Sequence, residues 1–96
     1  MEHTARNVVG VKIRQLRDSK KMSQEKLSVL CSRAGYELPR STLAKIESGI
    51  RAISDVEVFV IANALKVRIP ELFPPGLAKT IRDGKITPFH VRTTKD

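Results

Sequence analysis

The sequence predicts an all-α fold of five short helices, followed by a short basic C-terminal tail. Apolar residues recur at helical spacing in successive segments, and the first three quarters of the chain contain no convincing strand pattern. Glycine, proline and capping residues separate these segments. The chain has 96 residues, which is the length of one domain. We therefore expect a helical domain over residues 1–75 and a partly ordered basic tail over residues 76–96.

The first two helices are expected over residues 4–19 and 23–33. In the first, the apolar stripe consists of Val9, Ile13 and Leu16, at the i, i+4, i+7 spacing of one helix face. The second starts at Ser23, a residue type that favours the N-cap, and its inward residues are Leu27 and Leu30. Gly35 follows at a C-cap or turn position.

Three further helices are expected after this turn. Proline is tolerated in a first helical turn, so Pro39 starts the third helix, which Gly49 ends. Ser54 and Glu57 form an S-x-x-E capping box that starts the fourth. The last helix is short, over residues 70–73, and two prolines and a glycine end it. In the tail, Ile86, Phe89 and Val91 have the pattern of a short strand that Pro88 interrupts.

Charge and composition narrow the functional classes. The chain carries 18 Lys and Arg against 10 Asp and Glu, a net charge of +8, which favours a polyanion as the partner. The alternative is a basic surface without a specific partner. A single cysteine, Cys31, excludes an intramolecular disulfide and is interpreted as a small core residue. His3 and His90 have no ligand cluster around them, so neither a metal site nor any other cofactor is expected.

Other classes are disfavoured by what the sequence lacks. No apolar run approaches the ~20 residues that span a membrane, and the first residues show no signal-peptide pattern, so a cytoplasmic protein is expected. Nucleophile–base pairs, paired carboxylates and phosphate-binding loops are also lacking, so an enzyme is not expected.

The third expected helix has the features of a groove-reading helix. Leu43 and Ile46 anchor one side, while the other side carries Arg40, Ser41, Ala44 and Lys45. Arg can pair with guanine through two hydrogen bonds, Ser can bond to several bases, and Ala can touch a thymine methyl group. Taken alone, this polar face also fits a solvated surface helix.

Five segments in order resemble the Cro/C1-type helix-turn-helix family, which includes phage repressors and small bacterial regulators. These segments are IRQLR at 13–17, MSQEKL at 22–27, STLAKIESG at 41–49, IANALKV at 61–67 and ELF at 71–73. The resemblance covers about residues 8–73. It implies a five-helix fold like that of the lambda repressor, binding to double-stranded DNA, and a homodimer on the DNA.

The resemblance also implies roles for particular residues. Arg40, Ser41 and Lys45 would face base edges, Gln24 would contact a phosphate, and Thr42 and Ser48 would lie near the DNA backbone. Arg17 would pair with Glu47, an expectation that the cost of an unpaired buried carboxylate supports independently. For Gln24, plain solvent exposure at the helix start remains an equal alternative.

Arg51 follows the third helix and is a candidate for a phosphate contact, with a plain surface charge as the equal alternative. Two features differ from the family's shortest members. The connection between the second and third helices is longer and includes Gly35 and Tyr36. This leaves a margin of about one residue in which positions of the third helix are predicted to face the bases. Ser28 replaces a common packing alanine, and its hydroxyl is expected to bond to the carbonyl one turn back.

The sequence therefore predicts a sequence-specific DNA-binding regulator of transcription, with a repressor as the preferred form. The alternative is an antitoxin or interaction module of the same fold that binds a partner protein through its last helix or its tail.

Overall fold

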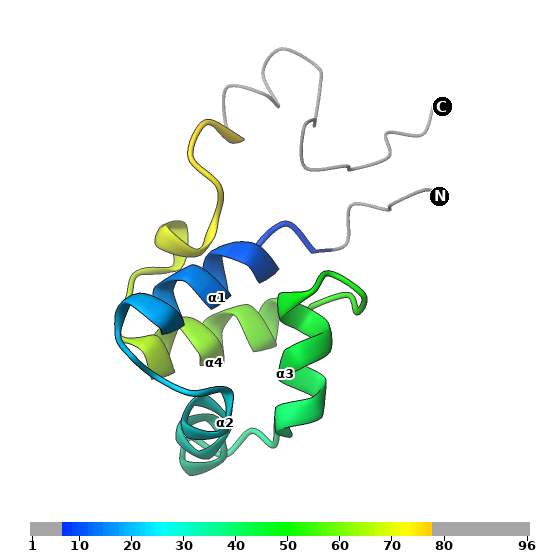
Figure 1. Ribbon diagram of the computed structural model, residues 1–96, viewed down its shortest axis with the longest axis vertical. Helices are drawn as coiled ribbons and strands as arrows, with labels where there is room; N and C mark the ends of the chain where they lie inside the picture. Colours follow the sequence, from blue (N-terminus) through cyan, green and yellow to red (C-terminus); the bar gives the residue numbers. More distant parts are fainter. Residues whose placement is uncertain (1–6, 78–96) are drawn as a thin grey trace.

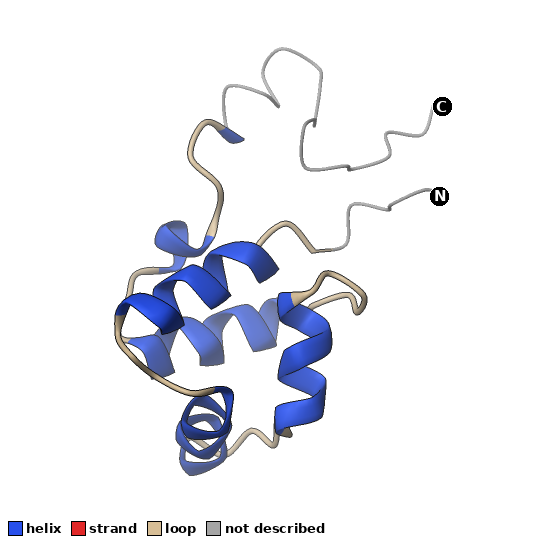
Figure 2. Cartoon of the chain, in the orientation of Figure 1, coloured by secondary structure: helices blue, strands red, loops and turns tan. Residues whose placement is uncertain are grey.

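The computed structural model describes residues 7–77, and all their regular structure is helical (Figures 1 and 2). Four α-helices, α1 (Gly10–Ser19), α2 (Gln24–Arg33), α3 (Arg40–Glu47) and α4 (Asp55–Leu65), precede a 3₁₀ turn, η1 (Ile69–Leu72). The all-α prediction is confirmed over this range, and the last expected helix is a 3₁₀ turn. The expected tail, with its strand-like residues 86–91, lies outside the described residues.

The first helix starts later than predicted. It begins at Gly10, whereas the sequence analysis began it at residue 4, and residues 7–9 have no helical structure. The reason is local, because the side-chain oxygen of Asn7 accepts hydrogen bonds from the backbone N–H groups of Val9 (3.1 Å) and Gly10 (2.8 Å). Such a turn competes with helix formation and fixes the start of α1.

The core lies where the four helices meet. In Figure 1, α1 and α4 lie side by side, α3 stands across one end of the pair, and α2 is seen nearly along its axis. Each helix contributes side chains with no exposed surface, among them Ile13, Leu27, Cys31, Leu43, Ile46, Ile61 and, from η1, Leu72. Burial also raises the pKa of the Cys31 thiol to about 11, so this cysteine is a core residue as predicted.

The predicted caps explain where the later helices begin and end. The Ser23 hydroxyl accepts from the backbone N–H of Lys26, and Ser54 and Glu57 form the predicted capping box. Gly35 and Gly49 have φ values of +95° and +81°, a conformation that glycine adopts without strain. Gly49 therefore ends α3 and turns the chain toward α4.

Close backbone packing fixes α3 against α1. A side-chain carbon built at Gly10 would overlap the backbone carbonyl oxygen of Ile46, so only glycine allows this approach. The side-chain nitrogen of Asn7 also donates to the carbonyls of Ile46 (2.8 Å) and Arg51 (3.0 Å). The start of α1 thus holds the carboxyl end of α3. Over residues 7–77, no helix is both long and apolar enough to cross a bilayer.

Candidate nucleic-acid interface

The outer face of α3 is polar and accessible. Arg40, Ser41 and Lys45 are exposed, whereas Leu43 and Ile46 have no exposed surface. At 100° per residue, positions 41, 44, 45 and 48 fall on the side opposite the two anchors, and Arg40 lies at the edge of that side, about 60° from Leu43. Within residues 7–77, neither Arg40 nor Lys45 has an ion-pair partner. The α3 face therefore presents two cations and a hydroxyl to an external partner.

Two hydroxyl residues lie at the margins of this face. Thr42 is half-buried on the side toward the core, and Ser48 is exposed at the C-cap of α3. The Ser48 hydroxyl donates to the backbone carbonyl of Lys45 at 3.1 Å, which satisfies one carbonyl at the helix end. Both hydroxyl oxygens still have acceptor or donor capacity toward a ligand beside α3.

Arg17 of α1 and Glu47 of α3 form a buried, two-pronged ion pair. Arg17 Nε donates to Glu47 Oε2 at 2.8 Å and Nη2 donates to Oε1 at 3.0 Å. The third nitrogen, Nη1, donates to the Met22 carbonyl at 2.7 Å. Hydrogen bonding to Glu47 raises the pKa of Arg17, against the opposing effect of burial. The Arg17 guanidinium thus joins α1, the turn before α2, and the last turn of α3.

Gln24, in the first turn of α2, is also joined to this pair. Its side-chain Nε2 donates to Glu47 Oε1 at 3.0 Å, a partner that the sequence analysis did not name. The amide nitrogen carries two hydrogens, so one remains for another acceptor. Because Glu47 holds the amide, Gln24 is fixed relative to α3 rather than free in solvent.

Arg51 is partly exposed, with 37% of its side chain accessible, and it is paired rather than standing as a plain surface charge. Its Nη1 and Nη2 atoms donate to the two carboxylate oxygens of Glu57, each at 2.9 Å, and Nη1 also donates to the Ala52 carbonyl. The Glu57 side chain is only 4% exposed. These bonds, with those from Ser54 N and the Tyr36 hydroxyl, lower the pKa of Glu57 to about 2 against the effect of burial.

Comparisons with known proteins agree with this geometry. The family model described as helix-turn-helix matches residues 13–72. The chain belongs to the helix-turn-helix family. Among solved structures, it is similar to the restriction-modification controller protein C.AhdI from Aeromonas hydrophila, at 37% identity and a TM-score of 0.61, over 68% of this chain and 91% of that one.

A second similar structure is a hypothetical transcription factor, NHTF, from Neisseria. It is 27% identical, with a TM-score of 0.63, over 79% of this chain and 83% of that one. A search of curated proteins found no match. The family and both structures support a DNA-binding regulator of transcription. We refer to α2, α3 and the connection between them as the helix-turn-helix unit.

The long helix-turn-helix connection is held at two points that sequence reasoning missed. The Ser28 hydroxyl donates to the Leu38 carbonyl at 2.7 Å, so the expected bond to a carbonyl one turn back is wrong. The Tyr36 hydroxyl donates to Glu57 Oε2 at 3.0 Å. Leu38 is 2% exposed and fills the space under the turn. The connection is therefore fixed to both α2 and α4, and it sets the start of α3.

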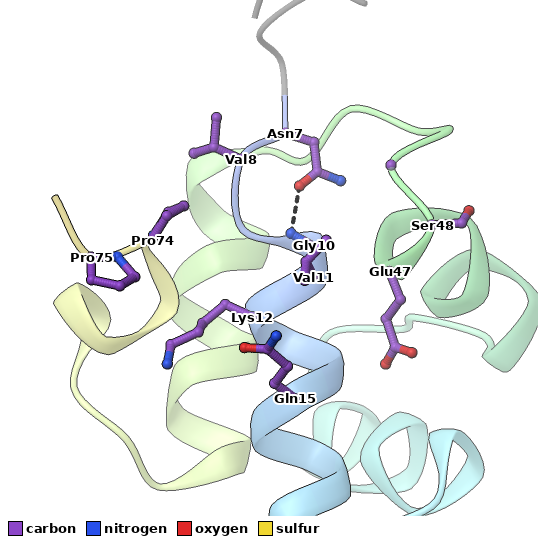
Figure 3. Close-up of a pocket in the computed structure, with 11 residues that line it drawn as sticks. Asn7, Val8, Gly10, Val11, Lys12, Gln15, Glu47, Ser48, Pro74 and Pro75 are labelled. Atoms are coloured by element: carbon purple, nitrogen blue, oxygen red, sulfur yellow. Dashed lines mark hydrogen bonds between the residues drawn. The ribbon is translucent and has the colours of Figure 1, made fainter. Parts of the chain in front are cut away.

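A cavity of about 350 Å³ lies at the carboxyl end of α3, where Ser48 is the one residue of the polar α3 side that lines it (Figure 3). The start of α1, the end of α3 and Pro74–Pro75 line it, and its wall contains none of Arg40, Ser41 and Lys45. Residues 7–77 also contain no cluster of three or more residues suited to hold a metal ion. The features that point to a ligand are therefore those of the α3 face.

Proposed function

We propose that this protein is a sequence-specific repressor that places α3 in the major groove of its operator. The observation that carries the proposal is the division of α3 into two sides. One side is held by Leu43, Ile46 and the Glu47 ion pair, and the other leaves Arg40, Ser41 and Lys45 accessible. A rigidly held helix with free polar side chains meets the requirement for reading base edges.

Arg40 and Ser41 are the leading base-reading residues. They lie in the first turn of α3, the end of a recognition helix that meets base edges. The guanidinium of Arg40 can pair with guanine O6 and N7, and the Ser41 hydroxyl can donate or accept. Lys45 lies one turn further along the same side and extends the reading face.

The DNA backbone contacts are assigned to Gln24, Thr42, Ser48 and Arg51. Gln24 offers the second amide hydrogen, together with the first N–H groups of α2. The Nε hydrogen and one Nη2 hydrogen of Arg51 take no part in its bonds to Ala52 and Glu57, but the Glu57 carboxylate matches its charge. We expect Arg51 to contribute hydrogen bonds to a phosphate with little net charge.

One recognition helix reads only a few base pairs, so we further propose that two copies bind the operator. Their α3 helices would lie ~34 Å apart on one face of the duplex. Similarity to a restriction-modification controller protein supports a regulatory role for this small chain. A protein that reads DNA in a bacterial cell belongs in the cytoplasm. The alternative is a module that binds a protein through its last helix or its tail, and the tail lies outside the described range.

Selection of bound duplexes from random DNA tests this function. The wild-type chain should return a two-fold related motif, and Arg40→Ala should lose preference at one position in each half-site, at a cost of ~1–3 kcal/mol. Arg33→Ala is the matched control, because it removes an exposed arginine at the end of α2 without touching the α3 face. An unchanged motif for Arg40→Ala would contradict the reading face, and absence of any enriched motif would contradict sequence-specific binding.

A further inference from the structure

The outward face of α4 carries a stripe of exposed side chains. At 100° per residue, four exposed residues fall within an arc of about 100°, and the exposed C-cap residue extends the stripe at the end of the helix: Asp55, Val56, Phe59 and Asn63, followed by Lys66. Phe59 is 58% exposed and Val56 is 52% exposed. Single exposed apolar residues are ordinary, but two large ones on neighbouring turns form a patch that indicates an interface.

This stripe is unsuited to DNA because it lies in the less basic part of the chain. Residues 7–51 carry ten basic and four acidic side chains, whereas residues 52–77 carry two basic and three acidic side chains. The middle of the stripe has no charge at all. A phosphate backbone would gain nothing from contact with this face.

The two charges of the stripe stand at opposite ends of α4. Asp55 is the first residue of the helix and Lys66 is its C-cap. Within residues 7–77, neither has an ion-pair partner. The midpoint between the two falls close to Phe59. Along the helix, the stripe therefore runs from an acidic residue through apolar residues to a basic residue. Two copies in antiparallel orientation would place each acidic end opposite a basic end.

We propose that α4 packs antiparallel on α4 of a second copy of this chain, with Phe59 at the centre of the contact. This proposal rests on the proposed DNA-bound homodimer and names its surface. Two-fold symmetry places each residue opposite the reversed sequence of the same helix. Asp55 then faces Lys66 of the partner subunit, and the reverse pair forms at the other end.

Charge and composition favour a second copy over an unlike protein. Two chains that each carry +8 repel one another across most faces, but not across this stripe, because its own charges cancel. Antiparallel helices also align their dipoles favourably, with each acid at a positive helix end and each base at a negative one. An aromatic residue at the centre with charges at the rim is the usual distribution of an interface hot spot.

Sedimentation equilibrium of the free protein tests the surface. The wild type should dimerise, and Phe59→Glu should weaken dimerisation by about thirtyfold or more. Val11→Glu is the matched control, because Val11 is 66% exposed and belongs to α1 rather than to the stripe, so its change should leave dimerisation intact. Thermal melts monitored by circular dichroism verify folding, and Phe59→Ser replaces Phe59→Glu if the latter fails to fold.

Charge exchange tests the antiparallel register. Asp55→Lys and Lys66→Asp should each weaken dimerisation severalfold, since each places like charges together at both ends. The double variant should recover most of the loss. A monomeric wild type, an unaffected Phe59→Glu variant, or a double variant no better than the singles would overturn the proposal.

Two further measurements with DNA test the proposed DNA binding separately from the proposed α4 contact. A monomeric Phe59→Glu variant should bind a half-site duplex as the wild-type monomer does and should lose only the tight binding to the full two-fold site. Failure of the wild type to bind either duplex would contradict the proposed function, while the dimerisation measured without DNA would still decide the α4 contact.

Discussion

Glu47 is the residue on which the position of the reading helix depends. It is 6% exposed, and it accepts hydrogen bonds from Arg17 and Gln24. One carboxylate thus connects α1, α2 and α3 at the carboxyl end of the recognition helix. A buried ion pair of this kind contributes little net stability compared with apolar packing, but leaving one partner alone is costly. We interpret the pair as a positioning device for α3.

Arg17→Ala should therefore destabilise the fold by ~3–5 kcal/mol, because it leaves the Glu47 carboxylate buried with only the Gln24 amide as partner. Arg14→Ala is the matched control on the same helix. Its ion pair with Asp18 spans 3.7 Å between side chains that are 68% and 59% exposed, so its loss should cost at most ~1 kcal/mol. Urea unfolding measures both variants.

The double variant Arg17→Met, Glu47→Leu tests whether the stability lost in Arg17→Ala comes from the unpaired Glu47 carboxylate. It should regain most of the stability lost in Arg17→Ala, since no buried charge remains. Equal stability of Arg17→Ala and Arg14→Ala would show that the buried pair has no special role.

The sequence was sufficient for contacts that follow from helical periodicity or from the cost of burial. Leu43, Ile46 and the Arg17–Glu47 pair were named from the residues or the family resemblance, and the structure brings them together. Asn7 and Tyr36 were missed as structural residues, and Ser28 was given the wrong partner, because the partners of the three lie 39, 21 and 10 positions away. A polar side chain next to a turn carries no sequence signal of such a distant partner.

At the level of the elements, the start of α4 and the helix-turn-helix connection share the Glu57 carboxylate. The sequence predicted Glu57 as one half of a capping box, and that is confirmed. The structure adds the Tyr36 hydroxyl and the Arg51 guanidinium to the same carboxylate. The loop after α3 and the turn before it are thus tied together, which restrains α3 at both ends.

Acid should release this restraint. The folded pKa of Glu57, about 2, lies below its ordinary value of 4.5, so the carboxylate stabilises the fold fully above about pH 4.5. That contribution is lost as the pH falls from about 4.5 toward about 2, as protons bind the unfolded chain first. Glu57→Gln should be less stable than the wild type at neutral pH, and the difference should shrink across this acid range.

Urea unfolding at several pH values between about 6 and 2, at constant salt, measures this difference. Glu25→Gln is the control, because Glu25 is exposed and has no ion pair in the described part of the chain. A gap between wild type and Glu57→Gln that stays constant through the acid range would contradict the role given to the Glu57 carboxylate.

For the whole molecule, the division of charge separates two surfaces. The part of the chain that contains α1, α2 and α3 has a net charge of +6, while residues 52–77 have a net charge of −1. The +8 charge of the full chain predicted a polyanion from composition alone, but the exposed residues of α4 belong to the less basic part of the chain. Composition carries no information about which charges share a face.

The salt dependence of DNA binding should distinguish the charged contacts from the neutral ones. Each cation that neutralises a phosphate releases counterions and steepens the fall of log K with log salt by ~0.9. In the proposed complex Gln24 contacts a phosphate as a neutral donor, so Gln24→Ala should lower affinity by a similar factor at every salt concentration and leave the slope unchanged. The paired substitution Lys20→Gln, Lys21→Gln, in the basic turn before α2, should make the slope shallower by up to ~2 per chain if both lysines reach the backbone.

Titrations of a labelled operator duplex at four or five salt concentrations measure both slopes, and thermal melts verify that each variant folds. Gln24 also donates to Glu47, so a loss of affinity counts only where the melting temperature is near that of the wild type. If Gln24→Ala changed the slope of log K against log salt, the substitution would have moved a cation away from the DNA. That result would indicate a displaced α3 rather than the loss of one phosphate contact. A wild-type affinity that does not change with salt would contradict the proposed contacts to the DNA backbone. It would also contradict the orientation of α3 in the groove that rests on those contacts.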